Sequence, residues 1–268
     1  MEPAEVRRAW QCPVCDSVAV AEMWDQMAEG FARAPVPGDD DSFIRLVRAH
    51  HAIGPTTSLL DIGCGSGGYT IALARGAGRA VGVDISPAMV RDAEDLAAVR
   101  GAGNVRFAVA DWNALSPDGP LLQEGFDIVY ARLAPAIRSA AAFEKMLGCC
   151  HGLGLLTKPA LRHDLVRTAV FAAAGLTDRS DDDDALRYAA VLLRARGLRP
   201  RYLREPDVWE LDRPVHEVLR YHLAQVRSLT PLTPALEQKV AAAVWALADG
   251  GVVHEHITSM RTTIYWEM

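Results

Sequence analysis

The residues best suited to chemistry lie in the segment LLDIGCGSGGYT, which runs from Leu59 to Thr70. Gly63, Gly65 and Gly68 satisfy the pattern G-x-G-x-x-G between an expected strand and an expected helix. Glycines permit a tight turn there and let a ligand approach the backbone closely. This pattern alone indicates a nucleotide-type cofactor, and it would equally suit a dinucleotide-dependent oxidoreductase.

Acidic positions around the glycine loop favour a different cofactor. Asp61 stands just ahead of the glycines, where dinucleotide-binding folds usually carry small apolar residues. Asp84 ends the next expected strand, where a carboxylate can accept hydrogen bonds from ribose hydroxyls. Asp111 and Trp112 follow the third expected strand and offer an acceptor beside a flat stacking surface. Asp61 and the Asp111-Trp112 pair weigh against a nicotinamide dinucleotide.

These motifs together resemble the class I S-adenosylmethionine-dependent methyltransferases. The resemblance covers residues 57–160 and is carried by DIGCGSG from Asp61, VGVDISP from Val81, ADW from Ala110 and FDIVY from Phe126. It implies that S-adenosyl-L-methionine is the cofactor and that the chain is an enzyme that transfers its methyl group.

The resemblance also implies a role for each position. Asp61 and the backbone from Gly63 to Gly67 would face the amino acid part of the cofactor. Asp84 would accept both ribose hydroxyls and Ile85 would pack on the adenine. Asp111 would accept a hydrogen bond from the adenine amino group, and Trp112 would lie beside the adenine ring. The expected cofactor-binding residues are Asp61, Gly63, Cys64, Gly65, Gly67, Asp84, Ile85, Asp111 and Trp112.

The substrate side carries fewer signals. Trp24 and Phe31 lie on an N-terminal helical segment that either closes over the site as a lid or packs on the sheet. Tyr69 follows the glycines and can reach the methionine moiety or the substrate, and Arg132 lies where the family places substrate-facing groups. The sequence assigns no catalytic base. The histidines considered, each also an ordinary surface or packed residue, are His216, His222, His254 and His256.

The segment after the fourth expected strand indicates the acceptor class. Methyltransferases that act on amino groups of nucleic acids usually show Asn or Asp, two prolines and an aromatic residue there. This chain instead reads ARLAPAI from Ala131 to Ile137. Its net charge is -6, from 28 Lys plus Arg against 34 Asp plus Glu, so a whole-protein basic field is missing. We expect a small-molecule substrate and no nucleic acid partner.

The cysteines leave one alternative open. Cys12 and Cys15 form half of a metal knuckle, and no second C-x-x-C follows. Cys149 and Cys150 are adjacent on an expected helix and point in different directions, so we expect no metal site. A thiol-assisted methyltransferase for a soft metalloid of the arsenic type stays an alternative. A non-catalytic, cofactor-binding partner subunit is the other.

The middle of the chain alternates short apolar strands with helices, which predicts right-handed crossovers and a parallel sheet. The expected fold is α/β, with a seven-stranded, mostly parallel Rossmann-like sheet whose last strand is antiparallel. We expect an N-terminal helical cap over residues 1–55 and a methyltransferase domain over 56–268, with a helical substrate cover at about 205–250. The expected strands are 58–62, 80–84, 105–110, 126–130, 154–157 and 257–266.

Composition agrees with a folded enzyme. The chain has 268 residues, of which 50% are hydrophobic and 23% charged, proportions of globular proteins. No apolar run approaches a membrane span, and Met1 to Gln11 lacks the apolar centre of a signal peptide. We expect a cytoplasmic protein without a membrane partner. The acceptor atom and the oligomeric state are left open by the sequence.

Overall fold

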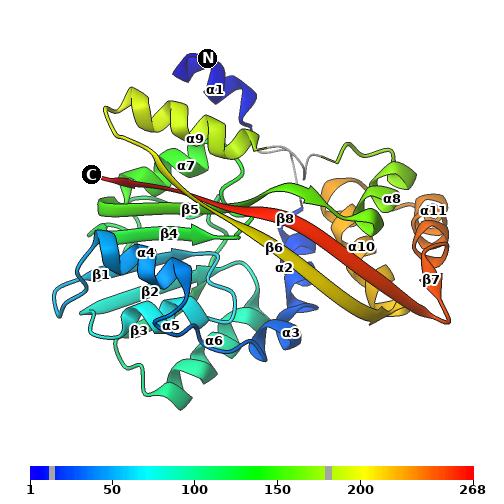
Figure 1. Ribbon diagram of the computed structural model, residues 1–268, viewed down its shortest axis with the longest axis horizontal. Coiled ribbons are helices and arrows are strands. Elements are labelled where there is room, and N and C mark those ends of the chain that lie inside the picture. The colour runs from blue at the N-terminus through cyan, green and yellow to red at the C-terminus, as the bar shows by residue number, and fades with distance from the viewer. Residues whose placement is uncertain (12–15, 179–182) are drawn as a thin grey trace.

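The computed structural model describes residues 1–11, 16–178 and 183–268, and its centre is one mixed β-sheet (Figure 1). The strands run in the order β3-β2-β1-β4-β5-β8-β6, and the short β7 pairs with β8. Helices cover both faces of the sheet. The strands are β1 Ser58–Ile62, β2 Arg79–Asp84, β3 Val105–Val109, β4 Phe126–Arg132, β5 Cys150–His163, β6 Arg201–Pro214, β7 Ala248–Asp249 and β8 Val252–Glu267.

Strand direction confirms the expected fold class. The pairs β1–β2, β2–β3, β1–β4 and β4–β5 are all parallel, so their carboxyl ends meet at one edge. The last long strand, β8, runs antiparallel to both β5 and β6. The sheet is therefore mostly parallel with an antiparallel last strand, as the resemblance implies.

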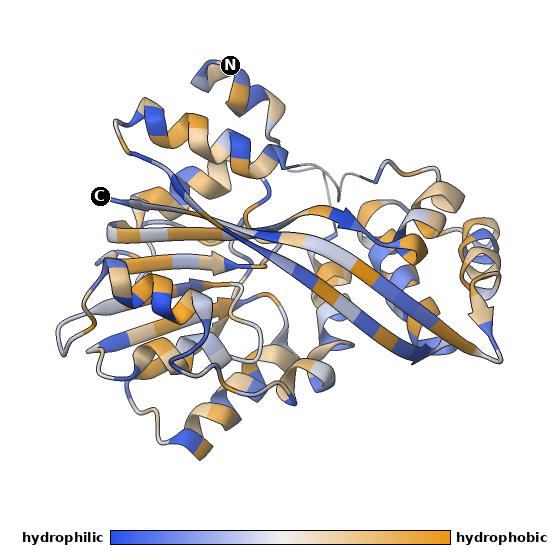
Figure 2. Ribbon diagram, viewed as in Figure 1, coloured by the Kyte–Doolittle hydropathy of each residue, from blue (hydrophilic) through white to orange (hydrophobic). Residues whose placement is uncertain are grey.

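Two hydrophobic clusters hold the two faces of the sheet. Side chains alternate along a strand, so Val129 and Ala131 of β4 face one cluster while Ile128 and Tyr130 face the other. The first cluster includes side chains of α1 Pro3–Ala9, α7 Ala140–Gly148 and α9 Asp184–Ala195. The second includes side chains of α4 Ser42–His50 and α5 Gly68–Ala74. Figure 2 shows that β4 and β5 are largely hydrophobic, as strands covered on both faces should be.

A long ribbon of β6 and β8 extends beyond the parallel strands to a second group of helices (Figure 1). Its far end carries a separate hydrophobic cluster that includes Val170, Val218 and Val244. The helices of this group are α8 Leu165–Ala174, α10 Val215–Leu229 and α11 Pro234–Trp245. Hydrophobic and hydrophilic residues alternate along the ribbon in Figure 2. This pattern fits strands with one covered face.

Several elements differ from expectation. β5 and β8 are longer than the expected strands 154–157 and 257–266, and β6 is not among the expected strands. Cys150 begins β5 instead of lying on a helix with Cys149.

The helix expected over 19–31 is two helices, α2 Ser17–Asp25 and α3 Ala28–Ala32. Residues 205–214 lie in β6, so the helices of the expected cover begin at Val215 instead of about 205. Pro206 lowers the strand signal there, and pairing with β8 overrides it because an edge strand tolerates a residue without an N–H. By contrast, α6 Pro87–Arg100 has the predicted bounds, with Ser86 as its N-cap.

None of the helices in the described ranges is long and apolar enough to cross a membrane.

We predict that Phe143→Ala lowers the free energy of unfolding by about 3–5 kcal/mol, because Phe143 is fully buried and its removal leaves a cavity. Its ring centroid lies 5.6 Å from that of Trp10, at the end of α1, and 5.5 Å from that of Trp266 on β8, so it joins these two elements. Urea unfolding of both proteins measures the change. Val99→Ala, at a residue that is 82% exposed, is the matched control. A loss below about 1 kcal/mol in the Phe143 variant would contradict this packing.

Candidate functional site

The glycine loop connects β1 to α5 through backbone shapes that L side chains rarely adopt. Gly63 and Gly65 have φ angles of 75° and 53°. A Cβ atom on Gly63 would lie 2.4 Å from the Cβ of Ala134, whereas one on Gly65 would meet open space. The N–H groups of Gly63 and Cys64 donate to the carbonyl of Val83 at 2.8 and 3.0 Å. The loop is therefore pinned to the end of β2 and open on its outer side.

Asp84 at the end of β2 is bonded to this loop. One carboxylate oxygen accepts from the N–H of Gly65 at 2.9 Å, and the other accepts from the N–H of Ser86 at 2.9 Å. Burial raises the pKa of Asp84, and these backbone hydrogen bonds partly oppose that shift. Each oxygen keeps a further lone pair for a ligand.

A cavity of about 450 Å³ opens beside the loop. Its wall includes residues from the carboxyl ends of β2 and β4 and residues that follow β3. The candidate residues that line it are Trp24, Phe31, Gly63, Cys64, Gly65, Tyr69, Asp84, Ile85, Asp111, Trp112 and Arg132. Eleven of the thirteen candidate positions thus share one cavity, and the two that do not line it are Asp61 and Gly67.

Asp61 lies beneath the loop instead of on the cavity wall. It is 3% exposed, and its carboxylate accepts a hydrogen bond from the hydroxyl of Thr70 on α5 at 2.6 Å. Burial raises the pKa of Asp61 to about 7, while the Thr70 hydroxyl opposes the shift. Asp61 is therefore a buried carboxyl behind the loop, and its contact with the amino acid part of the cofactor stays a prediction.

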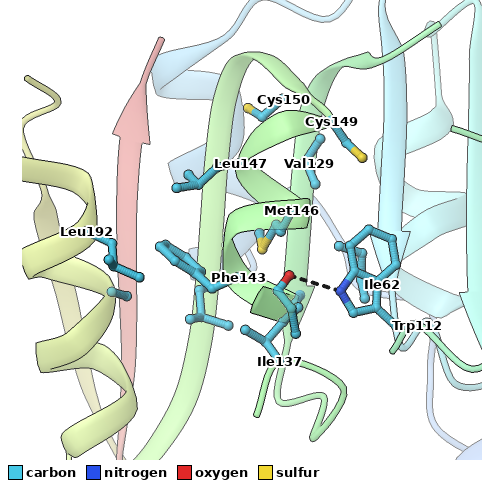
Figure 3. Packing of buried hydrophobic residues seen from close by; sticks show 14 of the residues in the cluster. Ile62, Trp112, Val129, Ile137, Phe143, Met146, Leu147, Cys149, Cys150 and Leu192 are labelled. Carbon is cyan, nitrogen blue, oxygen red and sulfur yellow. Dashed lines mark hydrogen bonds between the residues drawn. The ribbon is translucent and has the colours of Figure 1, made fainter. Parts of the chain in front are cut away.

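Asp111 and Trp112 follow the end of β3 and line the cavity. The indole N–H of Trp112 donates to the carbonyl of Ala142 at 3.1 Å, which fixes the ring plane (Figure 3). Lys145 approaches the same ring, 4.6 Å from its centroid. The Asp111 carboxylate accepts from the backbone N–H of Asn113 at 2.9 Å.

The N-terminal helices close over the cavity and are fixed to the cofactor loops. Trp24 and Phe31 line the cavity, and their ring centroids lie 6.1 Å apart. Next to Trp24, the carboxylate of Asp25 accepts from the Ser86 hydroxyl and from the N–H of Ala88 at the start of α6. The hydroxyl of Ser66 donates to the carbonyl of Phe31 at 3.1 Å. These contacts hold Trp24 and Phe31 beside the glycine loop and the start of α6.

Arg132 and Tyr69 are in contact at the carboxyl end of β4. The Arg132 guanidinium lies over the Tyr69 ring, 3.9 Å from its centroid. The Tyr69 hydroxyl donates to Asp41 at 2.9 Å, and burial raises the pKa of this phenol to about 12. Leu133, which follows, has a φ of 54°, an uncommon backbone shape for a non-glycine residue. The backbone of the cavity wall is thus strained at Leu133.

Other residues on the cavity wall gave no local sequence signal. They come from distant segments, and only the tertiary structure brings them together: Arg138, Pro159, Arg162, Asp207, Trp209 and Ser259. Tyr221 of α10 also lines the cavity. His222 is buried, which lowers its pKa to about 4, and the exposed His254 pairs with Asp212. None of the considered histidines in the described ranges lines the cavity.

The cysteines do not assemble around the cavity in the described chain. Cys149 and Cys150 are buried in the core beside Met146 and Leu147 (Figure 3). Burial raises the pKa of Cys64 in the loop, so its thiol is a poor source of thiolate. Cys12 and Cys15 lie outside the described residues. Among described residues no group of three or more His, Cys, Asp or Glu could hold a metal ion.

We predict that Asp61→Asn gains stability relative to the natural protein as the pH rises from 5 to 7. With a folded pKa near 7 and an unfolded value near 3.9, Asp61 binds more protons in the folded state across this window. Unfolding therefore releases a proton from Asp61, so the free energy of unfolding falls as the pH rises, by at most about 1.4 kcal/mol per pH unit. The amide of the variant has no such proton and removes this effect. Urea unfolding at several pH values measures the difference.

Asp127→Asn is the matched control for this experiment. Hydrogen bonds from Ser58 outweigh burial and lower the pKa of Asp127, so it stays ionised from pH 5 to 7. Its stability difference from the natural protein should be constant in that window. A constant difference for Asp61→Asn as well would contradict the raised pKa.

Part of the chain is similar in sequence to known methyltransferases. Residues 53–160 match the sequence model of a family described as a methyltransferase domain. A stretch of 103 residues, 38% of the chain, is 40% identical to the 23S rRNA (uracil(1939)-C(5))-methyltransferase RlmD of Alkalilimnicola ehrlichii and covers 22% of that protein. The RlmD protein of Xylella fastidiosa is 41% identical over 69 residues, 26% of this chain and 16% of that protein. The chain thus spans only about a fifth of these curated relatives.

Solved structures share the fold over most of the chain. The YcgJ protein from Bacillus subtilis has a TM-score of 0.53 and 18% identity, and the likeness covers 82% of this chain and 96% of that one. The geranyl diphosphate C-methyltransferase of Streptomyces coelicolor, solved with S-adenosyl-L-homocysteine, has a TM-score of 0.50 and 15% identity over 96% and 99%. Sequence match and fold agree: residues 53–160 match a methyltransferase domain, and the fold around them is shared with a solved methyltransferase.

Proposed function

We propose that this protein is an enzyme that transfers a methyl group from S-adenosyl-L-methionine to a small molecule. The observation that carries the proposal is the cavity beside the glycine loop, with Asp84 and Asp111 on one wall. The cofactor has a positively charged sulfonium, two ribose hydroxyls and an adenine amino group, and the wall offers acceptors for all the donors.

The cofactor-binding roles follow the order of the strands. Asp84 is fixed by Gly65 and Ser86, so its free lone pairs are directed before the ribose arrives. Ile85 beside it packs on the adenine, and Asp111 accepts from the adenine amino group. The backbone from Gly63 to Gly67 takes the methionine end, and Asp61 lies beneath it, bonded to Thr70.

The remaining requirement is a dry cavity in which the acceptor meets the sulfonium in line. The transferred methyl is already activated, so positioning and exclusion of water are the main tasks of the protein. Trp24 and Phe31 from the N-terminal helices, Trp209 from β6 and Tyr221 from α10 supply the cover. The cover combines residues from the expected N-terminal cap and from the late helical segment.

A small acceptor is favoured over RNA by this enclosure. Aromatic side chains from several separate segments line the cavity, and the net charge of the chain is -6. The RlmD proteins are named for rRNA methylation, but the shared stretches cover only 16–22% of the two compared above. A cytoplasmic location stays a prediction from the sequence. The metalloid alternative gains no support from the described cysteines, since Cys149 and Cys150 are in the core.

We predict that Asp84→Ala raises the dissociation constant for S-adenosyl-L-homocysteine at least about tenfold, since charge-assisted hydrogen bonds to two hydroxyls are lost. Isothermal titration calorimetry measures this. Asp84→Asn keeps one acceptor for the loop N–H groups and separates loop collapse from lost ligand contact. Asp95→Ala, an exposed position on α6, is the charge-matched control. An unchanged dissociation constant for a folded Asp84→Ala would remove this residue from the site.

We predict that labelled methyl groups enter low-molecular-weight products when the protein and labelled cofactor are incubated with a cell extract. Size fractionation followed by mass spectrometry identifies the product. Asp84→Ala, handled identically, provides the blank. Label recovered in the RNA fraction, and abolished by ribonuclease, would contradict the small-molecule acceptor.

A further inference from the structure

Three arginines line the part of the cavity away from the acidic residues. Arg132 ends β4, Arg138 lies in the loop before α7, and Arg162 lies near the end of β5. β4 and β5 are parallel and Arg132 pairs in register with Thr157, so Arg132 and the later Arg162 both lie toward the carboxyl ends of neighbouring strands. The cavity wall is thus positively charged on the side of β4 and β5.

The wall keeps unused hydrogen-bond donors within the described residues, although the carboxylates of Asp41 and Asp61 act on Arg132 from a distance. Arg132 stacks on Tyr69, and neither Arg132 nor Arg138 forms an ion pair with a described carboxylate. Arg162 donates from one terminal nitrogen to Asp164 at 2.9 Å. In all three side chains the buried Nε–H has no hydrogen-bond partner. Such groups cost free energy unless an acceptor arrives.

Two further basic side chains lie near this wall. Lys158 lies behind the loop, where its ammonium donates to the carbonyl of Ala134 at 2.6 Å. Burial and then the charge of Arg138 lower the pKa of Lys158 to about 7. Arg261 lies close enough to Arg132 to help lower the pKa of that guanidinium, after burial. Arg261 has Glu205 and Asp207 as counter-charges, so the groups that call for an acceptor are the three unpartnered Nε–H donors of the wall.

The methyl donor cannot supply that acceptor for all of them. S-adenosyl-L-methionine carries one carboxylate against a sulfonium and an ammonium, so its own net charge is positive. The carboxylates that line the cavity are Asp84, Asp111 and Asp207. The Oδ1 atom of Asp207 lies 3.7 Å from the Nη1 atom of Arg261. The missing acceptors must therefore come with the other ligand.

We propose that the methyl acceptor carries a carboxylate or phosphate group bound by Arg132 and Arg138, with Arg162 on the same wall. The planar guanidinium groups suit paired oxygen atoms. The body of the acceptor packs on Trp24, Phe31 and Trp209, which line the same cavity. This substrate class deepens the proposed methyl transfer and rests on it.

The test uses benzoate and phenyl phosphate as anionic probes and benzamide as their neutral counterpart. Each is titrated into the full chain by calorimetry, with and without saturating S-adenosyl-L-homocysteine. The variants are Arg132→Gln and Arg138→Gln, and the control is Arg106→Gln, an exposed arginine of β3 outside the cavity lining. Thermal unfolding verifies that each variant is folded.

We expect at least one anionic probe to bind at least about tenfold more tightly than benzamide, and each cavity variant to weaken it at least about fivefold. Arg106→Gln should change nothing, and S-adenosyl-L-homocysteine should bind all proteins within about twofold. The preference between benzoate and phenyl phosphate tells carboxylate from phosphate.

Two results would overturn the inference while leaving the methyl transfer intact. One is equal or undetectable binding of all probes by a protein that binds S-adenosyl-L-homocysteine. The other is a Arg132→Gln variant that loses S-adenosyl-L-homocysteine and keeps the probe, which would assign this arginine to the carboxylate of the cofactor. Failure of the natural protein to bind S-adenosyl-L-homocysteine would instead remove the proposed function and this inference with it.

Discussion

The hydrogen bond from the Gly65 N–H to the Asp84 carboxylate joins the two segments on which the site depends. Parallel pairing of β1 and β2 brings both strand ends to one edge, and the carbonyl of Val83 holds the loop from the other side. The carboxylate is thereby oriented without a ligand. A ligand then pays little ordering entropy at this position, since the acceptor is already in place.

Strand order separates the charges of the cavity. In the order β3-β2-β1-β4-β5, the glycine loop follows β1 at the point where the order reverses, which is where ligands bind in open α/β sheets. The carboxylates Asp84 and Asp111 follow β2 and β3 on one side, and Arg132 and Arg162 come from β4 and β5 on the other. A cationic methyl donor and an anionic acceptor would each face opposite charge, with the glycine loop between them.

The sequence predicted the parts of the fold whose signals are local. β1 has the predicted bounds Ser58–Ile62 because an apolar run ends at a glycine cluster, and α8 begins at Leu165 as expected. β6 depends on pairing with β8, far along the chain, so its polar, proline-containing sequence indicated only a partly extended segment. Likewise, burial of Asp61 under α5 depends on Thr70 packing above it, which motif spacing does not reveal.

The same distinction applies to the site. The glycine loop, Asp84 and Asp111 belong to short motifs, so spacing was enough to group them. Arg138 and Arg162 have no motif, and only the closure of the ribbon and the N-terminal helices around the strand ends brings them to the cavity. Of the arginines that would select the acceptor, the sequence therefore identified Arg132 and missed Arg138 and Arg162.

A crystal structure of the protein grown with S-adenosyl-L-homocysteine tests the central claim most directly. The account predicts the ligand along the glycine loop, with both ribose hydroxyls donating to the Asp84 carboxylate and the adenine between Ile85 and Trp112 near Asp111. Ligand density elsewhere in the cavity, with Asp84 bonded only to the N–H groups of Gly65 and Ser86, would contradict it.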